Sequence, residues 1–178
     1  LINAGNWSTT GNWASNIVAD GTGATAYLSN VITGNRTITL DIDPTIGNIF
    51  AQDTTHNYTI SGATRTLTLS GTPQIDVVTG RTLTIAAVLA GSDGLTKTGD
   101  GILAVTIASG NYGLIAIPQQ TGVTTVSGGL LRFTAGNYDG EDYGLFNSAY
   151  DTTGSTGGVG LDLATGISTA PWFGGLLG

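Results

Sequence analysis

The sequence of 178 residues contains no cysteine and no methionine, and Lys, Arg, Asp and Glu together make up only 10% of it. Without cysteine the chain forms no disulfide and offers no thiolate to a metal ion. It has a single lysine, Lys97, and a single glutamate, Glu141, so ion pairs between successive helical turns cannot support exposed helices. The fold must therefore be held by packing and by backbone hydrogen bonds.

The few charges are mostly negative. The net charge is −7 and the isoelectric point is near 4.1, and no cluster of basic residues is present to attract phosphates. No apolar run approaches the roughly 20 residues of a transmembrane helix, and residues 1–5 lack the basic segment of a signal peptide. We expect no nucleic-acid partner and no membrane span. The chain is expected to be a mature product or an ordered piece of a longer precursor.

The abundant residues are glycine, with 29 copies, and threonine, with 30. Threonine favours strands, and glycine permits sharp corners. Short segments alternate apolar and polar residues, which turns one face of each strand inward. Strands are expected to begin near residues 37, 46, 58, 67, 75, 83, 95, 103, 114, 124 and 130, with glycine-containing corners at 61–63, 70–73 and 79–81. This spacing fits a sandwich, a barrel or a solenoid.

Three near-copies of one phrase favour the solenoid. An arginine is followed by alternating threonine and apolar residues at Arg36–Leu40, Arg65–Leu69 and Arg81–Ile85. Recurrence of one short unit is typical of repeat architectures, in which each coil buries its apolar face against its neighbours. We therefore predict an all-β fold, a parallel β-helix of short strands rich in threonine and glycine. The three arginines are predicted to occupy equivalent places along one edge of the rod.

Two later stretches resemble the autotransporter-associated β-strand repeat. Residues 94–103 read GLTKTGDGIL and residues 122–133 read GVTTVSGGLLRF, and the phrase of that family runs G-L-x-K-x-G-x-G-x-L followed by G-x-T-x-V-x-x-G-x-L. The resemblance is carried by Lys97, Gly128 and Gly129. It implies a right-handed parallel β-helix in a secreted or surface-exposed bacterial protein, and it does not imply an enzyme. We expect no cofactor.

The composition changes near residue 136. Residues 1–136 are predicted to form the solenoid domain, and residues 137–178 a loop-rich cap with an apolar tail. Within the cap, Asp139, Glu141 and Asp142 surround a glycine and offer the oxygen ligands that Ca²⁺ prefers, although they lack EF-hand spacing. An ordinary acidic turn is the simpler interpretation, and we favour it.

Catalytic groups are scarce. The only histidine, His56, lies in a polar corner without a nucleophile motif. Asp41 and Asp43 are expected to share one face of a strand, where they could hold a cation or act on a sugar; two solvated carboxylates opposite a core-facing Leu40 and Ile42 are the favoured alternative. We expect no enzyme.

Arginines, aromatics and sequons remain as surface candidates. Arg36, Arg65 and Arg81 could bind an acidic polymer, but bonding to coil-edge carbonyls or to nearby Asp is favoured. Trp7 and Trp13 are expected to cap the N-terminal end of the core rather than to form a sugar-stacking face with the tyrosines. The three sequons, which are open to N-linked glycosylation, begin at Asn6, Asn35 and Asn57.

The two ends of a β-helix carry unpaired strand edges, which must be capped or used. A contact from the tail of one copy to the head of the next does not close and makes a filament. The leading hypothesis is accordingly an extracellular structural protein that self-associates end to end. The alternatives are an adhesin or carbohydrate-binding module, whose partner would be a glycan, and, last, a polysaccharide-degrading enzyme. The residues predicted to make the self-assembly contact are Leu1, Ile2, Pro171, Trp172, Phe173, Leu176 and Leu177.

Overall fold

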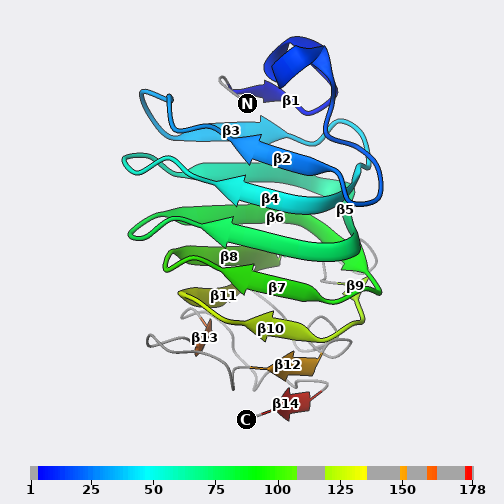
Figure 1. Ribbon diagram of the computed structural model, residues 1–178, viewed down its shortest axis with the longest axis vertical. Helices are drawn as coiled ribbons and strands as arrows, with labels where there is room; N and C mark the ends of the chain where they lie inside the picture. The colour runs from blue at the N-terminus through cyan, green and yellow to red at the C-terminus, as the bar shows by residue number, and fades with distance from the viewer. Residues whose placement is uncertain (1–3, 108–118, 136–148, 152–159, 164–174, 178) are drawn as a thin grey trace.

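The computed structural model describes residues 4–107, 119–135, 149–151, 160–163 and 175–177. Its strands form two parallel stacks that face each other across one core (Figure 1). The back stack contains β1 (Gly5–Asn6), β3 (Arg36–Thr39), the start of β5 (Tyr58–Val77), the start of β6 (Thr82–Gly91), β8 (Ile102–Ile107), β11 (Leu130–Ala135) and β13 (Gly160–Leu163).

The front stack contains β2 (Thr25–Leu28), β4 (Thr45–Ala51), the end of β5, β7 (Leu95–Thr98), β10 (Thr124–Val126), β12 (Ala149–Asp151) and β14 (Gly175–Leu177). The short β9 (Gln119–Gln120) pairs with the end of β6. Front strands run to the left and back strands to the right as the chain descends (Figure 1), which makes the coil right-handed. The predicted parallel β-helix is confirmed.

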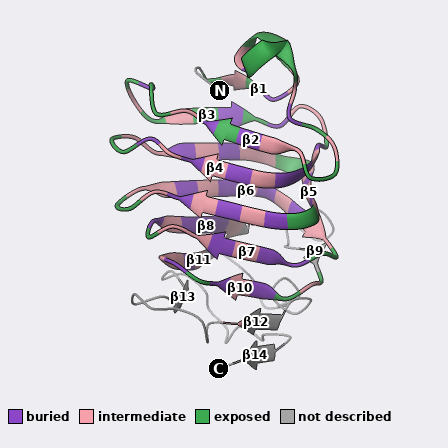
Figure 2. Ribbon diagram, viewed as in Figure 1, coloured by how far each residue is buried: buried purple, intermediate pink, exposed green. Residues whose placement is uncertain are grey.

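Apolar residues in equivalent places stack from coil to coil. On the back, Ile38 pairs in register with Ile60, Ile60 with Ile85 and Ile85 with Val105, and all four are buried. Along the chain these residues are 20 to 25 positions apart. Buried and partly exposed residues alternate along the strands (Figure 2), as the period of two in the sequence predicted.

The corners of the coil differ from the prediction. Glycine-containing segments at 61–63 and 70–73 were expected to end strands, but both lie inside β5, which bends around the coil from back to front. The bend coincides with a register shift between Gly62 and Thr66 relative to β6. A parallel ladder tolerates such a bulge, so the backbone pairing continues through it. The corner at 79–81 is a turn, as predicted.

The Arg-Thr phrases do not occupy equivalent places, which corrects that expectation. Arg36 pairs in register with Tyr58, and Tyr58 pairs with Leu83, so Arg81 lies two residues before the matching position. Arg65 lies at the bend of β5, on another side of the coil. The near-copies share a local alternation, and the variable length of the coils moves them out of line.

The N-terminal end of the core is capped, as predicted. Two short 3₁₀ helices, η1 (Thr10–Asn12) and η2 (Ala14–Asn16), lie above β3 (Figure 1). Trp7 is fully buried, and its Nε1 donates to the Ala19 carbonyl at 2.9 Å. Trp13 packs edge-on against Trp7 and donates to its carbonyl at 2.7 Å. Both indoles therefore close the core with their only polar group bonded.

One charged side chain points into the core. Lys97 pairs in register with Ile75 on one side and Val126 on the other, so it occupies an apolar column, and it is fully buried. Its ammonium group donates to the carbonyls of Thr98 (2.6 Å), Gly99 (2.8 Å) and Gly128 (3.0 Å). Three acceptors satisfy the three donors of the ammonium, and they tie the corner after β7 to the corner after β10.

Strands continue beyond residue 136, where a cap was predicted. β12, β13 and β14 extend the two parallel stacks, but most of the segment lies outside the described residues. The boundary between residues 136 and 137 accordingly stays a prediction. No helix in the described part of the chain is long and apolar enough to cross a membrane.

Candidate functional site

The front stack presents two columns of outward side chains, which we call the front face. Because Ala26, Ile49, Ile75 and Lys97 point inward, strand alternation turns their neighbours outward. Register then stacks them into columns. The first column is Thr25, Asn48, Gln74, Thr96 and Thr125, and the second is Tyr27, Phe50, Asp76 and Thr98.

Hydrogen bonds hold the polar part of the front face in one arrangement. Thr98 Oγ1 donates to Asp76 Oδ2 at 2.7 Å and accepts from Gln74 Nε2 at 2.9 Å. The amide of Gln52 donates to Asp76 Oδ1 at 2.6 Å. At the N-terminal end of the second column, Tyr27 and Phe50 stack with ring centroids 5.1 Å apart. Such networks fix side-chain positions before any ligand arrives.

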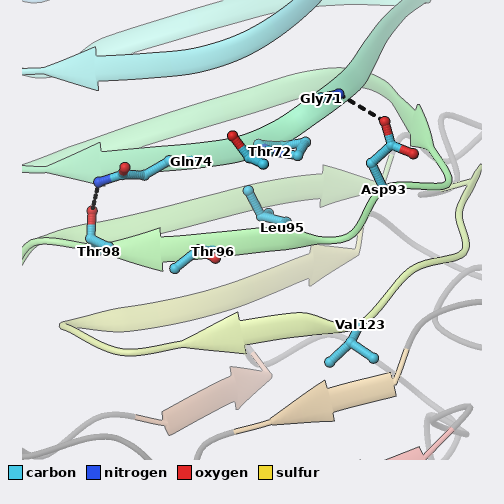
Figure 3. A pocket seen from close by; sticks show the side chains of 9 residues that line it. Gly71, Thr72, Gln74, Asp93, Leu95, Thr96, Thr98 and Val123 are labelled. Carbon is cyan, nitrogen blue, oxygen red and sulfur yellow. Dashed lines mark hydrogen bonds between the residues drawn. The ribbon is translucent and has the colours of Figure 1, made fainter. Parts of the chain in front are cut away.

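A hollow of about 420 Å³ opens beside these columns. It lies between the end of β5, β7 and the residue before β10 (Figure 3). The residues that line it are Gly71, Thr72, Pro73, Gln74, Asp93, Leu95, Thr96, Thr98 and Val123. These residues bring hydroxyl groups, an amide, a carboxylate and small apolar groups together around the hollow.

Asp93 is fixed at the edge of the hollow. Its Oδ2 accepts from the Gly71 amide at 2.7 Å and from the Ser70 hydroxyl at 3.3 Å, and its Oδ1 accepts from Ser92 at 3.3 Å. The bond from the Gly71 amide is the main cause that lowers the pKa of Asp93 below its ordinary value, with the two serines adding to it. Asp93 is therefore an ionised acceptor at neutral pH.

The predicted carboxylate pair is not assembled. β3 ends at Thr39, so Asp41 and Asp43 lie in the following turn rather than on a strand. Asp41 accepts from the amide and hydroxyl of Ser8, whereas Asp43 accepts from the Thr66 amide at 2.8 Å. The two carboxylates thus serve different coils. Leu40 is buried and Ile42 packs against the core, as expected.

His56 lies beside a structural aspartate. Asp53 is buried, and its Oδ1 accepts from the amides of Thr55 (2.8 Å) and His56 (2.6 Å). Burial opposes ionisation of Asp53, but these hydrogen bonds outweigh it and lower its pKa. The Nδ1 of His56 lies 3.4 Å from Asp53 Oδ1 and 2.7 Å from the Thr55 hydroxyl. The cluster stabilises a corner of the coil.

Arg81 and Arg65 make the contacts that were favoured, to a carbonyl and to an aspartate, whereas Arg36 bonds a hydroxyl instead. Arg81 Nη1 donates to the Thr55 carbonyl at 2.8 Å, and Arg65 Nη1 lies 3.5 Å from Asp43 Oδ2. Arg36 Nη2 donates to the hydroxyl of Thr33 at 3.4 Å. Since each guanidinium serves its own corner, they do not form one basic stripe for an acidic polymer.

Two of the sequon asparagines belong to a ladder between coils. The side-chain oxygen of Asn35 accepts from the Asn57 amide at 2.9 Å, and that of Asn57 accepts from the Thr82 amide at 3.0 Å. The carbonyl of Asn6 accepts from the side chain of Asn12 at 3.2 Å. Glycosylation at these positions stays a prediction.

Several predicted residues cannot be placed. The calcium candidates Asp139, Glu141 and Asp142 lie outside the described residues, and so do Leu1, Ile2, Pro171, Trp172 and Phe173 of the self-assembly contact. Leu176 and Leu177 belong to β14, which pairs with β12. In the parts of the chain that the structure describes, no group of three metal-binding side chains comes together.

The hollow was not predicted from the sequence. Gln74 and Asp93 carried no motif, and Thr96 stands at a variable position of the repeat phrase. Their only signal was the outward position of polar residues in or beside alternating strands. Tyr27 was considered as one of several scattered aromatics, and its partner Phe50 was not. Register decides which residue of one coil lies beside which residue of the next. The varying lengths of the coils hide that register from the sequence.

Comparison with known proteins yields one partial similarity. The chain is 44% identical over 85 residues to the adhesin BmaC autotransporter of Brucella suis biovar 1 (strain 1330). The aligned stretch covers 48% of this chain but only 2% of that protein. No family model matches the chain, and no solved structure matches it significantly. The similarity and the parallel coil together agree with a passenger β-helix of autotransporter type.

Proposed function

We propose that this chain is a rod-forming segment of a surface-exposed, adhesin-type bacterial passenger and that its role is not enzymatic. The observation that carries the proposal is the combination of a parallel β-solenoid with 44% identity over 85 residues to an autotransporter adhesin. A solenoid suits this role because each coil adds length and exposes a new strip of lateral surface. The front face supplies ordered polar and aromatic groups for a partner.

A polysaccharide-degrading activity has less support. It required a carboxylate pair that could act on one sugar, and Asp41 and Asp43 are engaged by Ser8 and Thr66 on different coils. Glycans therefore enter the proposal as ligands and not as substrates.

Adhesion can be tested with the isolated chain on latex beads. Lys97 is the only lysine and is buried, so amine coupling at neutral pH attaches the folded chain through its α-amino group. We expect coated beads to bind cultured epithelial cells several-fold more than beads coated with albumin. An excess of soluble folded chain should abolish the difference, and heat-denatured chain should not. Equal binding by both kinds of bead would contradict the proposal.

End-to-end self-association is the second candidate. It is proposed from the apolar side chains of residues 171–177, two of which, Leu176 and Leu177, lie in β14, which pairs with β12. Because Trp7 and Trp13 close the core at the other end, the partner would join by strand addition to β1 or β2 rather than by completing the core.

Self-association predicts species larger than a monomer in sedimentation velocity at high concentration, and filaments in negative-stain micrographs. Deletion of residues 171–178 removes β14 and should return the chain to a monomer with unchanged circular dichroism in the far ultraviolet. A wild-type chain that sediments as a monomer at every concentration would eliminate the fibre while leaving the adhesin proposal intact.

A further inference from the structure

The hollow on the front face carries an inference about the ligand. Its wall contains hydroxyl and amide groups that are positioned but not fully used. Thr72 and Thr96 line it, and no hydrogen bond from either hydroxyl reaches another described residue. Gln74 donates from its Nε2 to the Thr98 hydroxyl, and its Oε1 remains as an acceptor for a ligand. A ligand rich in hydroxyl groups complements this arrangement, because each hydroxyl both donates and accepts.

The hollow also offers apolar contact at short range. Val123 supplies it, because this residue is 47% exposed at the rim, whereas Leu95 and Pro73 lie beneath the hollow and are themselves buried. Sites for small molecules combine such apolar surface with a few placed polar groups, and their volumes are roughly 300–1,000 Å³. A volume of about 420 Å³ is large enough for roughly one or two sugar units by that standard.

Charge selects among sugars. Asp93 is the ionisable group that lines the hollow, and no Lys, Arg or His is among the described lining residues. An ionised carboxylate accepts hydrogen bonds from a pair of hydroxyls, but it repels a uronate, a sialate or a phosphate. The site thus discriminates against acidic ligands by repulsion as well as by the lack of a partner.

We propose that the hollow formed by Thr72, Gln74, Asp93 and Thr96 binds one or two units of a neutral glycan. The inference rests on the proposed adhesin-type role for its biological setting and names the ligand class of the front face. Asp93 accepts from sugar hydroxyls, Gln74 and the two threonines complete the polar contacts, and the C–H face of the ring lies against Val123. The aromatic pair of Tyr27 and Phe50 is not needed for this contact.

The test is an array of neutral oligosaccharides and their sialylated and uronic counterparts, probed with the full chain. We expect the wild-type chain to bind neutral members. Thr96→Tyr fills the hollow and should weaken binding at least tenfold. Thr37→Tyr is the matched control, because Thr37 faces outward on β3 of the back stack, where the same change should leave binding as it was. Tyrosine is well accepted in strands, and far-ultraviolet circular dichroism checks that both variants fold.

A second variant, Gln74→Leu, keeps the size of the side chain, removes its polar atoms and should also weaken binding severalfold. The inference is overturned by an array without neutral ligands, by a preference for acidic members, or by binding that Thr96→Tyr leaves unchanged. Beads that adhere to cells while the array stays empty would defeat this inference alone. An array that is positive for neutral glycans while the beads do not adhere would defeat the adhesin proposal alone.

Discussion

Replacing Lys97 by Met is expected to lower the free energy of unfolding by about 2–4 kcal/mol. Methionine has a similar length and suits an apolar column, so packing changes little. It leaves the carbonyls of Thr98, Gly99 and Gly128 without the ammonium that they share. The variant no longer has to bury a charge, and this gain offsets part of the loss of three hydrogen bonds. The expected loss of stability is therefore smaller than the sum of the three bonds.

Urea denaturation followed by circular dichroism measures this loss. Arg65→Met is the control, because Arg65 and Asp43 are both about half exposed and 3.5 Å apart, and such a pair contributes at most about 1 kcal/mol. If both variants lost the same small amount, Lys97 would not hold the two corners together.

The pH dependence provides a separate signature of Lys97. Burial lowers its pKa from 10.5 to about 8, although Asp76 and Asp100 oppose the shift. Between these values the unfolded chain binds more protons than the folded chain, so the free energy of unfolding rises with pH in this window. Below pH 8 both states are protonated and the burial penalty is fully present.

The wild-type chain should therefore gain stability from pH 8 to pH 10, and Lys97→Met should lack this gain. Tyr58 does not interfere, because burial raises its pKa to about 12. The ordinary pKa of a tyrosine is 10.0. The contribution of Tyr58 to the free energy of unfolding is therefore complete below pH 10 and is lost only above it. Parallel curves for the wild type and Lys97→Met would contradict the assignment.

Replacing Gly129 by Ala is expected to lower the free energy of unfolding by more than about 3 kcal/mol, or to prevent folding. Gly129 has φ +67°, and a Cβ there would overlap the Gly101 carbonyl oxygen and lie 2.6 Å from that of Gly99. These atoms belong to the backbone of the preceding coil, where Leu130 donates to the Gly101 carbonyl at 3.1 Å. The neighbouring coil cannot move away without losing its pairing.

Gly80→Ala is the matched control. Gly80 has a similar φ of +74°, but nothing lies within 4 Å of its Cβ position. It therefore reports only the backbone strain of a left-handed alanine, about 1–2 kcal/mol. The difference between the two variants in urea denaturation isolates the close approach of coils. Equal losses would show that the space around Gly129 is not limiting.

The parts of the fold that were predicted depend on local chemistry. Scarce charge and abundant threonine and glycine indicated strands, and the alternation at Thr37–Leu40 or Leu83–Ala86 identified which side chains point inward. Burial of indoles at the chain start follows from their size, so the cap of Trp7 and Trp13 could be predicted as well. The strands of Thr25–Leu28 and Gln119–Gln120 were missed, because they are only four and two residues long.

The parts that failed depend on coil length. Ile60 and Ile85 stack although 25 residues separate them, whereas Ile85 and Val105 stack at a separation of 20. An extra residue in a corner leaves the local alternation intact, but it changes which residue of the next coil lies opposite a given residue. For this reason the three arginine phrases were predicted to occupy equivalent places, which they do not.

The sequence by itself determined that this chain is built of strands, because an apolar residue at every second position has to be buried on one face, and its repeated phrases favoured a solenoid over a sandwich or a barrel. It also singled out Lys97 and the glycines of the second repeat phrase. Only the tertiary structure decided what lies beside what. Gln74, Asp93 and Thr96 come from two coils, and the hydrogen-bonded register of β5 against β7 brings them to one hollow. Register is set by long-range backbone pairing, and no local pattern in the sequence specifies it.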